Sequence, residues 1–494
     1  GLEIDSWEVG MQNWTSGFEG EFCERTGYDL IKYLPAMTGK IVGSKEMTER
    51  FLWDIRRVQA DLLADNYYGE FRNLCNQYGL VSYCEPYDRG PMEELQIGSR
   101  VDGVMGEFWN GLSAIFQNNL MMRRTTKLAS SIAHINGQKV VGAEAYTSEP
   151  ESGRWQEYPF ALKAVGDKAF TEGINRMVIH RYAMQPHPDA APAMTLGPWG
   201  IHFDRTNTWW EPGRAWIDYL NRCQTLLQEG LFVADFAYFT GDNIVGYTKV
   251  HRRDLNPVPP EGYDYDLMNT ETLLNRAWVE RGRLRLPDGM NYRVLVLQEQ
   301  SHITLGLLRK LRNMVEQGLI IVGARPQQTV GLQSYSVIEE KEFEQLCDEL
   351  WGKAATTVVD RSVGKGRIFW ETSLNLEQVL EKIRLRPDFE VITDSISAPI
   401  RYIHRQIGEA DVYFVANQQR TSKELICNFR VKGKIPEFWN PISGERTRAM
   451  VYQTNEETIS VPVQLEAYGS VFVVFRSDLP EQKAIRSIPV SYTH

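Results

Sequence analysis

The most constraining feature of this chain is a set of short apolar runs that each deliver one polar side chain beside an aromatic residue. Four runs in the first 150 residues carry a glutamate, and they are Leu2–Glu8, Leu80–Glu85, Val101–Trp109 and Val140–Tyr146. A fifth run, Arg176–Tyr182, carries a histidine instead. Strands that each present one polar group at their carboxyl end are what an active site on a β/α barrel requires. The runs therefore predict parallel strands with a functional site along one edge.

Carboxylates beside aromatic rings indicate sugar chemistry, because glycosidic cleavage uses two carboxyl groups and sugar rings stack on aromatic faces. A carboxylic acid protonates a leaving oxygen only if its pKa is raised, which an apolar or aromatic neighbourhood does. A second carboxylate then activates water or attacks the sugar carbon directly. Glu8 directly follows Trp7, and Glu144 lies two residues before Tyr146, so both residues fit this pair of roles. A single glutamate at a strand end is usually a solvated loop residue, and only the repetition favours the functional interpretation.

Composition and charge argue against several other classes of protein. The 494 residues are 43% hydrophobic and 24% charged, as in ordinary globular proteins. The net charge of −10 and the lack of a basic stripe argue against a nucleic-acid partner. The six cysteines form no CxxC pair, which disfavours a disulfide framework or a structural zinc site. No apolar run reaches the roughly 18 residues of a membrane span, and no leader-like segment opens the chain.

The hydrophobic pattern divides the chain into four segments. Residues 1–245 alternate strands with amphipathic helices such as Thr48–Leu63, and Leu231–Phe239 is expected to be a further strand of the same parallel sheet. Residues 246–290 carry proline and glycine turn signals and form a connecting segment. Residues 291–390 are expected to form a small α/β domain. Residues 391–494 are expected to form a β-sandwich with a C-terminal tail, because apolar residues recur there at period two.

The first segment holds too few strands for a closed barrel. We count about six barrel-like strands before residue 245, whereas a (β/α)8 barrel has eight. A sheet that cannot close leaves exposed edges, which are costly and prone to aggregation. We therefore expect an α/β fold with a (β/α)8-type barrel that is N-terminally incomplete in this chain and is completed by an upstream part of a longer protein.

Other polar residues near the same runs are further candidates. Glu107, with Arg100 and Asp102 shortly before it, lies in the sugar site or serves as an oxygen ligand for a hard cation such as calcium. Glu85 either holds substrate hydroxyls or pairs with Arg89. These alternatives stay open from the residues alone.

A histidine and a tryptophan-rich loop complete the set of candidates. His180 ends its strand and is either a hydrogen-bonded structural residue or a contact to a sugar hydroxyl. The segment Gly197–Trp210 is too polar and glycine-rich for a core helix, and it is typical of a long loop at a binding mouth. The alternative is a capping loop whose tryptophans, Trp209 and Trp210 among them, pack inward.

The sequence resembles a known family, the bacterial α-L-rhamnosidases of glycoside hydrolase family 106. The strings that carry the resemblance are Leu2–Thr15, Gly106–Trp109, Gly142–Thr147, Gly197–Trp210, Gly262–Asp266 and Leu286–Tyr292. They are spread over most of the chain. The resemblance implies an inverting enzyme with a (β/α)8 barrel, two catalytic glutamates and a calcium ion in the sugar site.

Carried onto this sequence, the resemblance implies Glu8 as the general acid, Glu144 as the general base and Glu107 as the calcium-associated carboxylate. The residues expected to bind the substrate around them are Asp5, Glu85, Arg100, Asp102, His180, Trp209 and Trp210. The expected function is removal of terminal α-L-rhamnosyl residues from an oligosaccharide, polysaccharide or glycoside, with calcium as cofactor. The resemblance favours a periplasmic or extracellular location.

Two alternatives remain beside this expectation. One is another barrel glycosidase that acts on galactosides or similar sugars. The other is a truncated, non-catalytic remnant that only binds carbohydrate.

Overall fold

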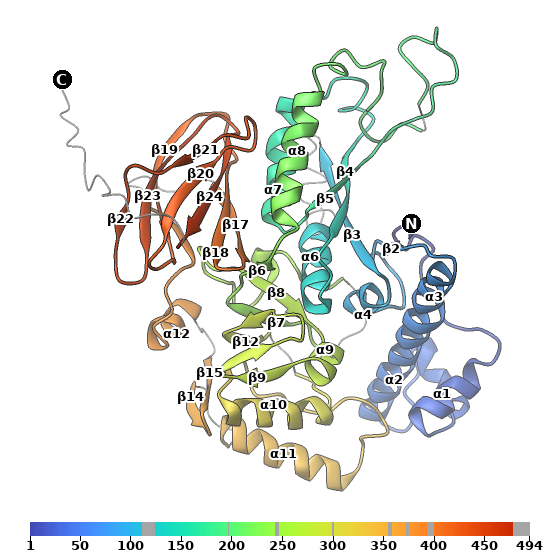
Figure 1. Cartoon of the computed structure of the whole chain (residues 1–494). Helices are drawn as coiled ribbons and strands as arrows, with labels where there is room; N and C mark the ends of the chain where they lie inside the picture. Colours follow the sequence, from blue (N-terminus) through green and yellow to red (C-terminus); the bar gives the residue numbers. More distant parts are fainter. Residues whose placement is uncertain are drawn as a thin grey trace.

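The computed structural model describes residues 1–110, 124–195, 197–242, 247–298, 301–353, 358–371, 375–392 and 400–477. Figure 1 shows a parallel sheet with its helices from the first half of the chain, an α/β body drawn below it, and two antiparallel sheets from the C-terminal part. The expected C-terminal tail lies outside the described residues. In the part of the chain that is described, no helix is both long and apolar enough to cross a lipid bilayer.

The first sheet has five strands in the order β1-β2-β3-β4-β5, and every neighbouring pair is parallel. The strands are β1 (Leu2–Ile4), β2 (Ser82–Cys84), β3 (Gly103–Asn110), β4 (Val141–Ser148) and β5 (Arg176–Ile179). Because all five run in one direction, their carboxyl ends meet at one edge of the sheet. That edge carries the polar residues predicted from the sequence.

Helices lie between these strands in the chain and after the last of them. They are α1 (Phe18–Thr26), the 3₁₀ segment Ile31–Thr38, α2 (Lys45–Leu63), the π-helical turn Ala64–Gly69, α3 (Glu70–Gln77), α4 (Glu94–Ser99), α6 (Thr125–Asn136), α7 (Pro159–Thr171) and α8 (Arg214–Leu227). Helix α2 begins after Ser44, whose side chain accepts a hydrogen bond of 3.1 Å from the Met47 amide. Helices α6 and α7 pack against β3 and β4.

The prediction that Leu231–Phe239 extends this first sheet is wrong. The segment splits into β6 (Leu231–Phe232), which pairs with a strand of the C-terminal sheets, and β7 (Phe236–Phe239), which belongs to the α/β body. Asp235 separates the two strands. Its buried carboxylate pairs with Arg430 of the C-terminal part at 2.8 Å and with Arg293 of the α/β body at 3.2 Å. These ion pairs hold the chain at Asp235 against those two parts, so the chain has left the first sheet before this residue. The α/β body therefore begins earlier than residue 245.

The α/β body contains a six-stranded sheet in the order β14-β15-β13-β12-β7-β8. Its further strands are β8 (Tyr265–Met268), β12 (Val294–Leu297), β13 (Ile320–Val322), β14 (Val358–Val363) and β15 (Gly366–Glu371), and β14 is the antiparallel edge strand. Its helices are α9 (Thr270–Asn275), α10 (Leu305–Gln317), α11 (Val337–Trp351) and α12 (Leu376–Lys382), with a 3₁₀ turn at Arg252–Asp254. A separate small sheet contains β9 (Trp278–Glu280), β10 (Arg283–Arg285) and β11 (Asn291–Tyr292).

The C-terminal part forms two antiparallel sheets. One contains β16 (Phe389–Ile392), β19 (Lys423–Phe429), β23 (Ile459–Leu465) and β22 (Gln453–Thr454). The other contains β21 (Arg446–Arg448), β20 (Ile435–Trp439), β24 (Ser470–Arg476), β18 (Ala410–Asn417), β17 (Ile400–Ile407) and β6. Buried residues of both sheets form one apolar cluster, in which Tyr413 and Phe475 of one sheet contact Phe429 of the other.

A charged histidine lies inside this C-terminal part. His404 of β17 is buried, its Nδ1 lies 3.0 Å from an oxygen of Asp388, and its Nε2 lies 3.1 Å from Asp411. Burial alone would lower the pKa of His404, but the two carboxylates outweigh it and raise that pKa to about 9. The ring also stacks on Tyr413 with centroids 3.9 Å apart.

This arrangement predicts a pH-dependent stability. The folded-state pKa of His404 lies above its ordinary value of 6.5. The stabilisation of the fold by the protonated imidazole is therefore complete below pH 6.5 and is lost as the pH rises through 9. The free energy of unfolding should fall by roughly 3 kcal/mol over that interval. Urea denaturation of the wild type and of His404→Gln between pH 6 and 9.5 measures this. A slope that is the same in both proteins would contradict the prediction.

Candidate active site

Five predicted residues lie directly after strands of the first sheet or within them. Asp5 follows β1, Glu85 follows β2, and His180 follows β5. Glu107 and Glu144 lie within β3 and β4 rather than at their ends, and they are direct register partners in the parallel pair. Register partners in neighbouring strands point to the same face of a sheet. The two carboxylates therefore lie side by side.

Three carboxylates converge closely at this edge. Ligand oxygens of Asp5, Glu85 and Glu144 all lie within 4.8 Å of one another. Burial, followed by the charge of Glu107, raises the pKa of Glu85 well above its ordinary value, although Glu85 accepts a hydrogen bond from the Tyr87 hydroxyl. Such crowding of negative charge favours either shared protons or a bound cation.

Glu107 is a second carboxyl in this group whose pKa is strongly raised. It is 8% exposed and accepts a hydrogen bond of 3.1 Å from the Trp109 indole. Burial raises its pKa to about 8, and the charges of Glu144, Asp5 and Glu8 add to the increase. Glu107 therefore carries a proton at neutral pH in the cation-free protein.

Glu8 lies at the exposed side of the cluster. The Ser6 hydroxyl lies 3.4 Å from its Oε1, and its charge contributes to the raised pKa of Glu107. Trp7 beneath it donates its indole N–H to the Gly10 carbonyl at 2.7 Å. Glu8 thus lies on the solvent side of the buried carboxylates, where a departing group has room to leave.

A β-bulge shapes the surroundings of Glu144. The pairing of β3 with β4 shifts between Phe108 and Trp109, so that Tyr146, with φ of 66°, is the extra residue. A bulge re-aims the side chain that follows it. Thr147 consequently turns its hydroxyl toward Glu144 and donates a hydrogen bond to Oε1.

His180 completes the surroundings of Glu144 on the other side. Its Nδ1 lies 3.1 Å from the Thr147 hydroxyl and 3.6 Å from Glu144 Oε1. Burial lowers the pKa of His180 despite the nearby carboxylate. The imidazole is therefore neutral at neutral pH, and it holds Glu144 in position together with Thr147.

Helix α6 supports Glu107 from behind. The Thr125 hydroxyl donates to the Glu107 carbonyl at 2.6 Å and accepts from the Glu107 amide at 3.1 Å. This contact requires glycine at position 106, because a Cβ there would lie 2.6 Å from the Thr125 carbonyl oxygen. The Gly106-Glu107 pair in the sequence thus has a packing reason.

Two indole rings border the carboxylates. Trp109 contacts Trp199 edge-to-face with ring centroids 5.8 Å apart, and Trp199 is 44% exposed. The loop that carries Trp199 is held by Arg181, whose Nε donates to the Trp199 carbonyl at 2.7 Å. Exposed indole faces beside carboxylates are suited to the apolar faces of a sugar ring.

The predictions for Arg100 and Asp102 are wrong. Both residues precede β3 and therefore lie at the amino-terminal edge of the sheet, opposite the carboxylates. Arg100 pairs with Asp65 at 2.9 Å and with Glu271 at 2.8 Å. Asp102 pairs with Arg72 at 2.7 Å and accepts the Ser82 amide at 3.1 Å, so the charged groups of both residues form ion pairs away from the carboxylates.

The side chains of Trp209 and Trp210 pack inward, as the second of the two interpretations of this loop predicted. The Trp209 indole donates to the Glu157 carbonyl at 2.7 Å, and its ring packs on Trp216. Trp210 packs against Phe203 with ring centroids 5.1 Å apart. The structure places Trp199 of the same loop, not these two residues, beside Trp109.

Three residues that touch the carboxylates were not singled out from the sequence, namely Tyr87, Trp109 and Thr147. Tyr87 and Trp109 each lie two residues after a glutamate on the same strand or its extension, which is the spacing that puts side chains on one face. The sequence therefore carries a periodic signal for both residues. Thr147 lies at an odd spacing from Glu144, and only the bulge at Tyr146 brings it to the same face.

Buried and exposed carboxyls along the carboxyl edge of a parallel sheet, bordered by indole rings, are the arrangement on which glycoside hydrolases rely. The chain belongs to glycoside hydrolase family 106, because the model of that family, described as alpha-L-rhamnosidase, matches residues 2–454. The motifs in the sequence and the family model thus agree on the family.

Solved and curated relatives cover nearly the whole chain. A rhamnosidase from Novosphingobium sp. PP1Y is 32% identical with a TM-score of 0.89, over 99% of this chain and 45% of that one. A protein from Formosa agariphila described as a putative beta-glucuronidase is 39% identical over 98% of this chain and 39% of its own length. The chain therefore spans less than half the length of both relatives.

More distant structures share the fold alone. A family 42 β-galactosidase from G. stearothermophilus is 11% identical with a TM-score of 0.58, over 93% of this chain and 75% of that one. The apo exo-carrageenase from Bacteroides ovatus is 9% identical with the same TM-score, over 93% of this chain and 62% of that one. The α/β class predicted from the sequence is the one these structures share.

Proposed function

We propose that this protein hydrolyses terminal α-L-rhamnosyl residues of glycans or glycosides. The observation that carries the proposal is the side-by-side placement of Glu107 and Glu144 with Asp5, Glu85 and Glu8 around them at one sheet edge. The family to which the chain belongs supports rhamnose as the sugar. Rhamnose-containing oligosaccharides, polysaccharides or small glycosides are accordingly the proposed partners.

In the proposed mechanism, Glu144 accepts a proton from the attacking water while Glu8 protonates the departing oxygen. Thr147 and His180 orient the Glu144 carboxylate, and the exposed position of Glu8 suits an acid that must meet varied leaving groups. Attack by water opposite the leaving group inverts the anomeric centre. Trp109 and Trp199 would stack on the sugar and exclude water from one side of it.

We propose calcium as the cofactor. The crowded oxygens of Asp5 and Glu85 fit a hard cation, because calcium prefers carboxylate ligands and a positive charge would oppose the burial and the charge repulsion that raise the pKa of Glu85. Glu107 next to them remains the further carboxylate associated with the ion. When bound, the ion would supply positive charge for the sugar hydroxyls and for the charge that develops during cleavage.

The five parallel strands are proposed to belong to a (β/α)8-type barrel, and the two antiparallel C-terminal sheets to form a β-sandwich. Parallel pairing throughout the first sheet, with its acidic residues at the carboxyl edge, supports the first part. The shared apolar cluster between the two antiparallel sheets supports the second.

A panel of nitrophenyl glycosides tests the proposed function. We expect turnover of the α-L-rhamnoside and none of the β-D-galactoside or β-D-glucuronide, which represent the sugars in the names of the other relatives. ¹H NMR of the sugar released from the rhamnoside should show the β-anomer first. Turnover of another glycoside in preference to the rhamnoside would overturn the proposal.

Removing the cation should abolish most of this turnover. After treatment with a chelator, the rate on the rhamnoside is expected to fall and to return on addition of calcium. The variant Asp5→Asn should need a higher calcium concentration for half-maximal rate, because it loses one charged ligand. Full activity in excess chelator would argue against the cofactor.

A further inference from the structure

A hollow lies between helix α8 and the turn that joins β20 to β21, and none of the site carboxylates lines it. Its volume is about 270 Å³. It is lined on one side by Asn221, Arg222, Thr225 and Leu226 and on the other by Trp439, Asn440, Pro441, Gly444, Arg446 and Phe472. Pockets for drug-sized ligands are roughly 300–1,000 Å³, so this one has room for about one sugar residue.

Two guanidinium groups line this hollow, and both are held in place. Arg446 lies over the Trp439 ring at 3.9 Å from its centroid, and the two residues are direct cross-strand partners. Arg222 donates from Nη1 to the carbonyls of Pro441 at 3.1 Å and Ile442 at 2.8 Å. Gly444 leaves room for it, because a Cβ there would lie 3.2 Å from Arg222 Nε.

Neither arginine has a carboxylate partner within 4.0 Å in the part of the chain that the structure describes. The acceptors of Arg222 are neutral carbonyls, and the partner of Arg446 is an aromatic ring. No aspartate or glutamate is among the residues that line the hollow. Two fixed positive charges thus share one pocket in a protein whose net charge is −10. An anion would relieve their repulsion and would meet a donor fork that is already oriented.

The rest of the lining is suited to a sugar ring. The Asn221 amide both donates and accepts hydrogen bonds, as sugar hydroxyls require. The Thr225 hydroxyl donates to the Asn221 carbonyl at 2.7 Å and keeps lone pairs for a sugar hydroxyl. Asn440 Oδ1 accepts the Ile442 and Ser443 amides at 2.8 and 3.2 Å, so Asn440 contributes its NH₂ group as a donor. Half-buried Leu226 supplies apolar surface for the C–H faces of a pyranose, whereas Phe472 of the lining is only 1% exposed.

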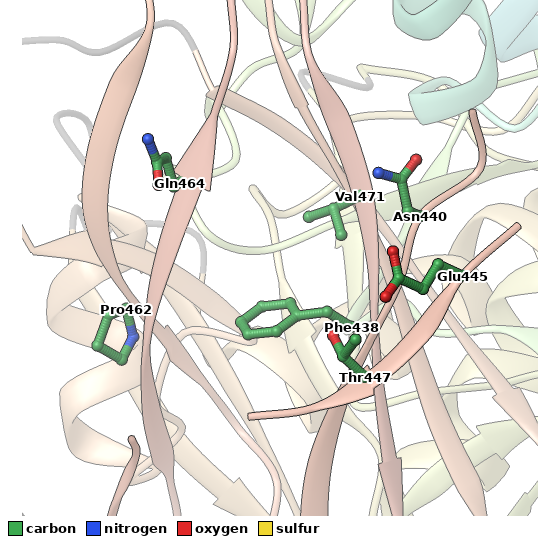
Figure 2. Close-up of a pocket in the computed structure, with 7 residues that line it drawn as sticks. All are labelled: Phe438, Asn440, Glu445, Thr447, Pro462, Gln464 and Val471. Atoms are coloured by element: carbon green, nitrogen blue, oxygen red, sulfur yellow. The ribbon is translucent and has the colours of Figure 1, made fainter. Parts of the chain in front are cut away.

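The opposite face of the same two strands provides a built-in contrast. A neighbouring hollow has a volume of about 300 Å³. Figure 2 shows the residues that line it, Phe438, Asn440, Glu445, Thr447, Pro462, Gln464 and Val471. Successive strand residues point to opposite faces, so Phe438 and Thr447 face this hollow while Trp439 and Arg446 face the other. Its charged residue is Glu445, so it would repel the anion that the arginine-lined hollow attracts.

We propose that the hollow between α8 and the β20–β21 turn binds a sugar residue that carries a carboxylate or sulfate group. Arg222 and Arg446 bind the anionic group, and the amide and hydroxyl side chains bind the ring hydroxyls. The choice of a sugar as the carrier of the charge rests on the proposed function. The site would hold an acidic unit of a polysaccharide while the carboxylate edge of the first sheet, which repels anions, acts on a neutral residue.

Direct binding measurements on the whole chain test this proposal. The probes are glucuronate, glucose 6-sulfate, glucose and inorganic sulfate. The affinity of the protein for each of them is measured by calorimetry or NMR titration at low salt. The two anionic sugars share the glucose ring and differ from glucose at C6. Charge-assisted hydrogen bonds of the usual strength predict that at least one anionic sugar binds about ten-fold tighter than glucose. It should also bind tighter than inorganic sulfate.

Variants locate the binding. Arg446→Gln should remove the preference for the anionic sugar, and Arg446→Lys should keep only part of it because the fork is lost. The matched control is Arg448→Gln, which removes the same charge from the same strand but does not line the hollow. Melting temperatures of all variants should equal that of the wild type, since Arg446 is exposed.

The outcomes separate this proposal from the proposed function. Arg446→Gln should leave the rate on a small neutral rhamnoside unchanged. Equal binding of glucose and both anionic sugars would overturn the proposal. So would an anionic preference that survives Arg446→Gln, or sulfate that binds as tightly as the anionic sugars. An anionic preference lost in Arg446→Gln supports the site even if no rhamnoside is turned over.

Discussion

The variant Glu144→Gln is expected to hydrolyse a nitrophenyl α-L-rhamnoside about 10²–10⁴-fold more slowly than the wild type, with the loss in kcat. Glutamine has nearly the same shape and still accepts the hydrogen bond from Thr147, so the fold is retained. It cannot take a proton from water. Steady-state kinetics together with circular dichroism measure the two effects separately.

Glu8→Gln should lose activity in a different pattern. A nitrophenolate departs without help from an acid, whereas an alkoxide needs a proton as the bond breaks. The loss in Glu8→Gln is therefore expected to be larger for methyl α-L-rhamnoside than for the nitrophenyl compound. In Glu144→Ala, by contrast, added azide should restore turnover of the nitrophenyl compound, because an anionic nucleophile needs no base.

An exposed glutamate in the same part of the chain provides the control. Glu151 lies in the loop after β4, and Glu151→Gln should keep the wild-type rate. Near-normal turnover by Glu8→Gln or Glu144→Gln would remove that residue from its proposed role. Azide rescue of the Glu8 variant in place of the Glu144 variant would exchange the two roles.

The parts of this site that follow from strand periodicity were predictable from the sequence. Asp5, Glu85 and His180 follow apolar strands, and parallel strands bring such residues to one edge. The prediction for Arg100 and Asp102 rested on their closeness to Glu107 in sequence. It failed because both residues precede β3 and therefore lie at the opposite end of that strand from the carboxylates. A strand of eight residues separates its two ends by more than a side chain can reach.

Features that depend on tertiary contacts were not predictable in this way. The bulge at Tyr146 leaves no periodic signal, yet it decides that Thr147 faces Glu144. The apolar run Leu231–Phe239 has the composition of one strand, but the two arginine partners of Asp235 divide it between two sheets. Those arginines, Arg293 and Arg430, lie far away in sequence.

The largest expected effect on stability comes from a buried ion pair beneath the site. Arg124 and Glu94 have side chains that are 0% and 3% exposed, and Arg124 Nη1 donates to Glu94 Oε2 at 2.8 Å. The Thr248 amide donates to the same oxygen at 3.1 Å, and the guanidinium lies 4.7 Å from the centroid of Tyr247. Arg124 directly precedes α6, the helix whose Thr125 holds Glu107.

Arg124→Met is therefore expected to lower the free energy of unfolding by about 3–5 kcal/mol, because it leaves the Glu94 carboxylate buried without its counter-charge. The double variant Arg124→Met/Glu94→Leu should recover much of this loss, since it removes the stranded charge as well. The exposed pair Arg309–Glu342, with N–O distances of 2.6 and 2.7 Å, is the matched control. Arg309→Met should change little, because solvent screens that pair. Urea denaturation of the four proteins measures the difference, and equal stability of Arg124→Met and Arg309→Met would contradict the prediction.

Since the ion pair fixes the start of α6, a destabilised Arg124→Met protein that still folds should also bind substrate less tightly than the wild type.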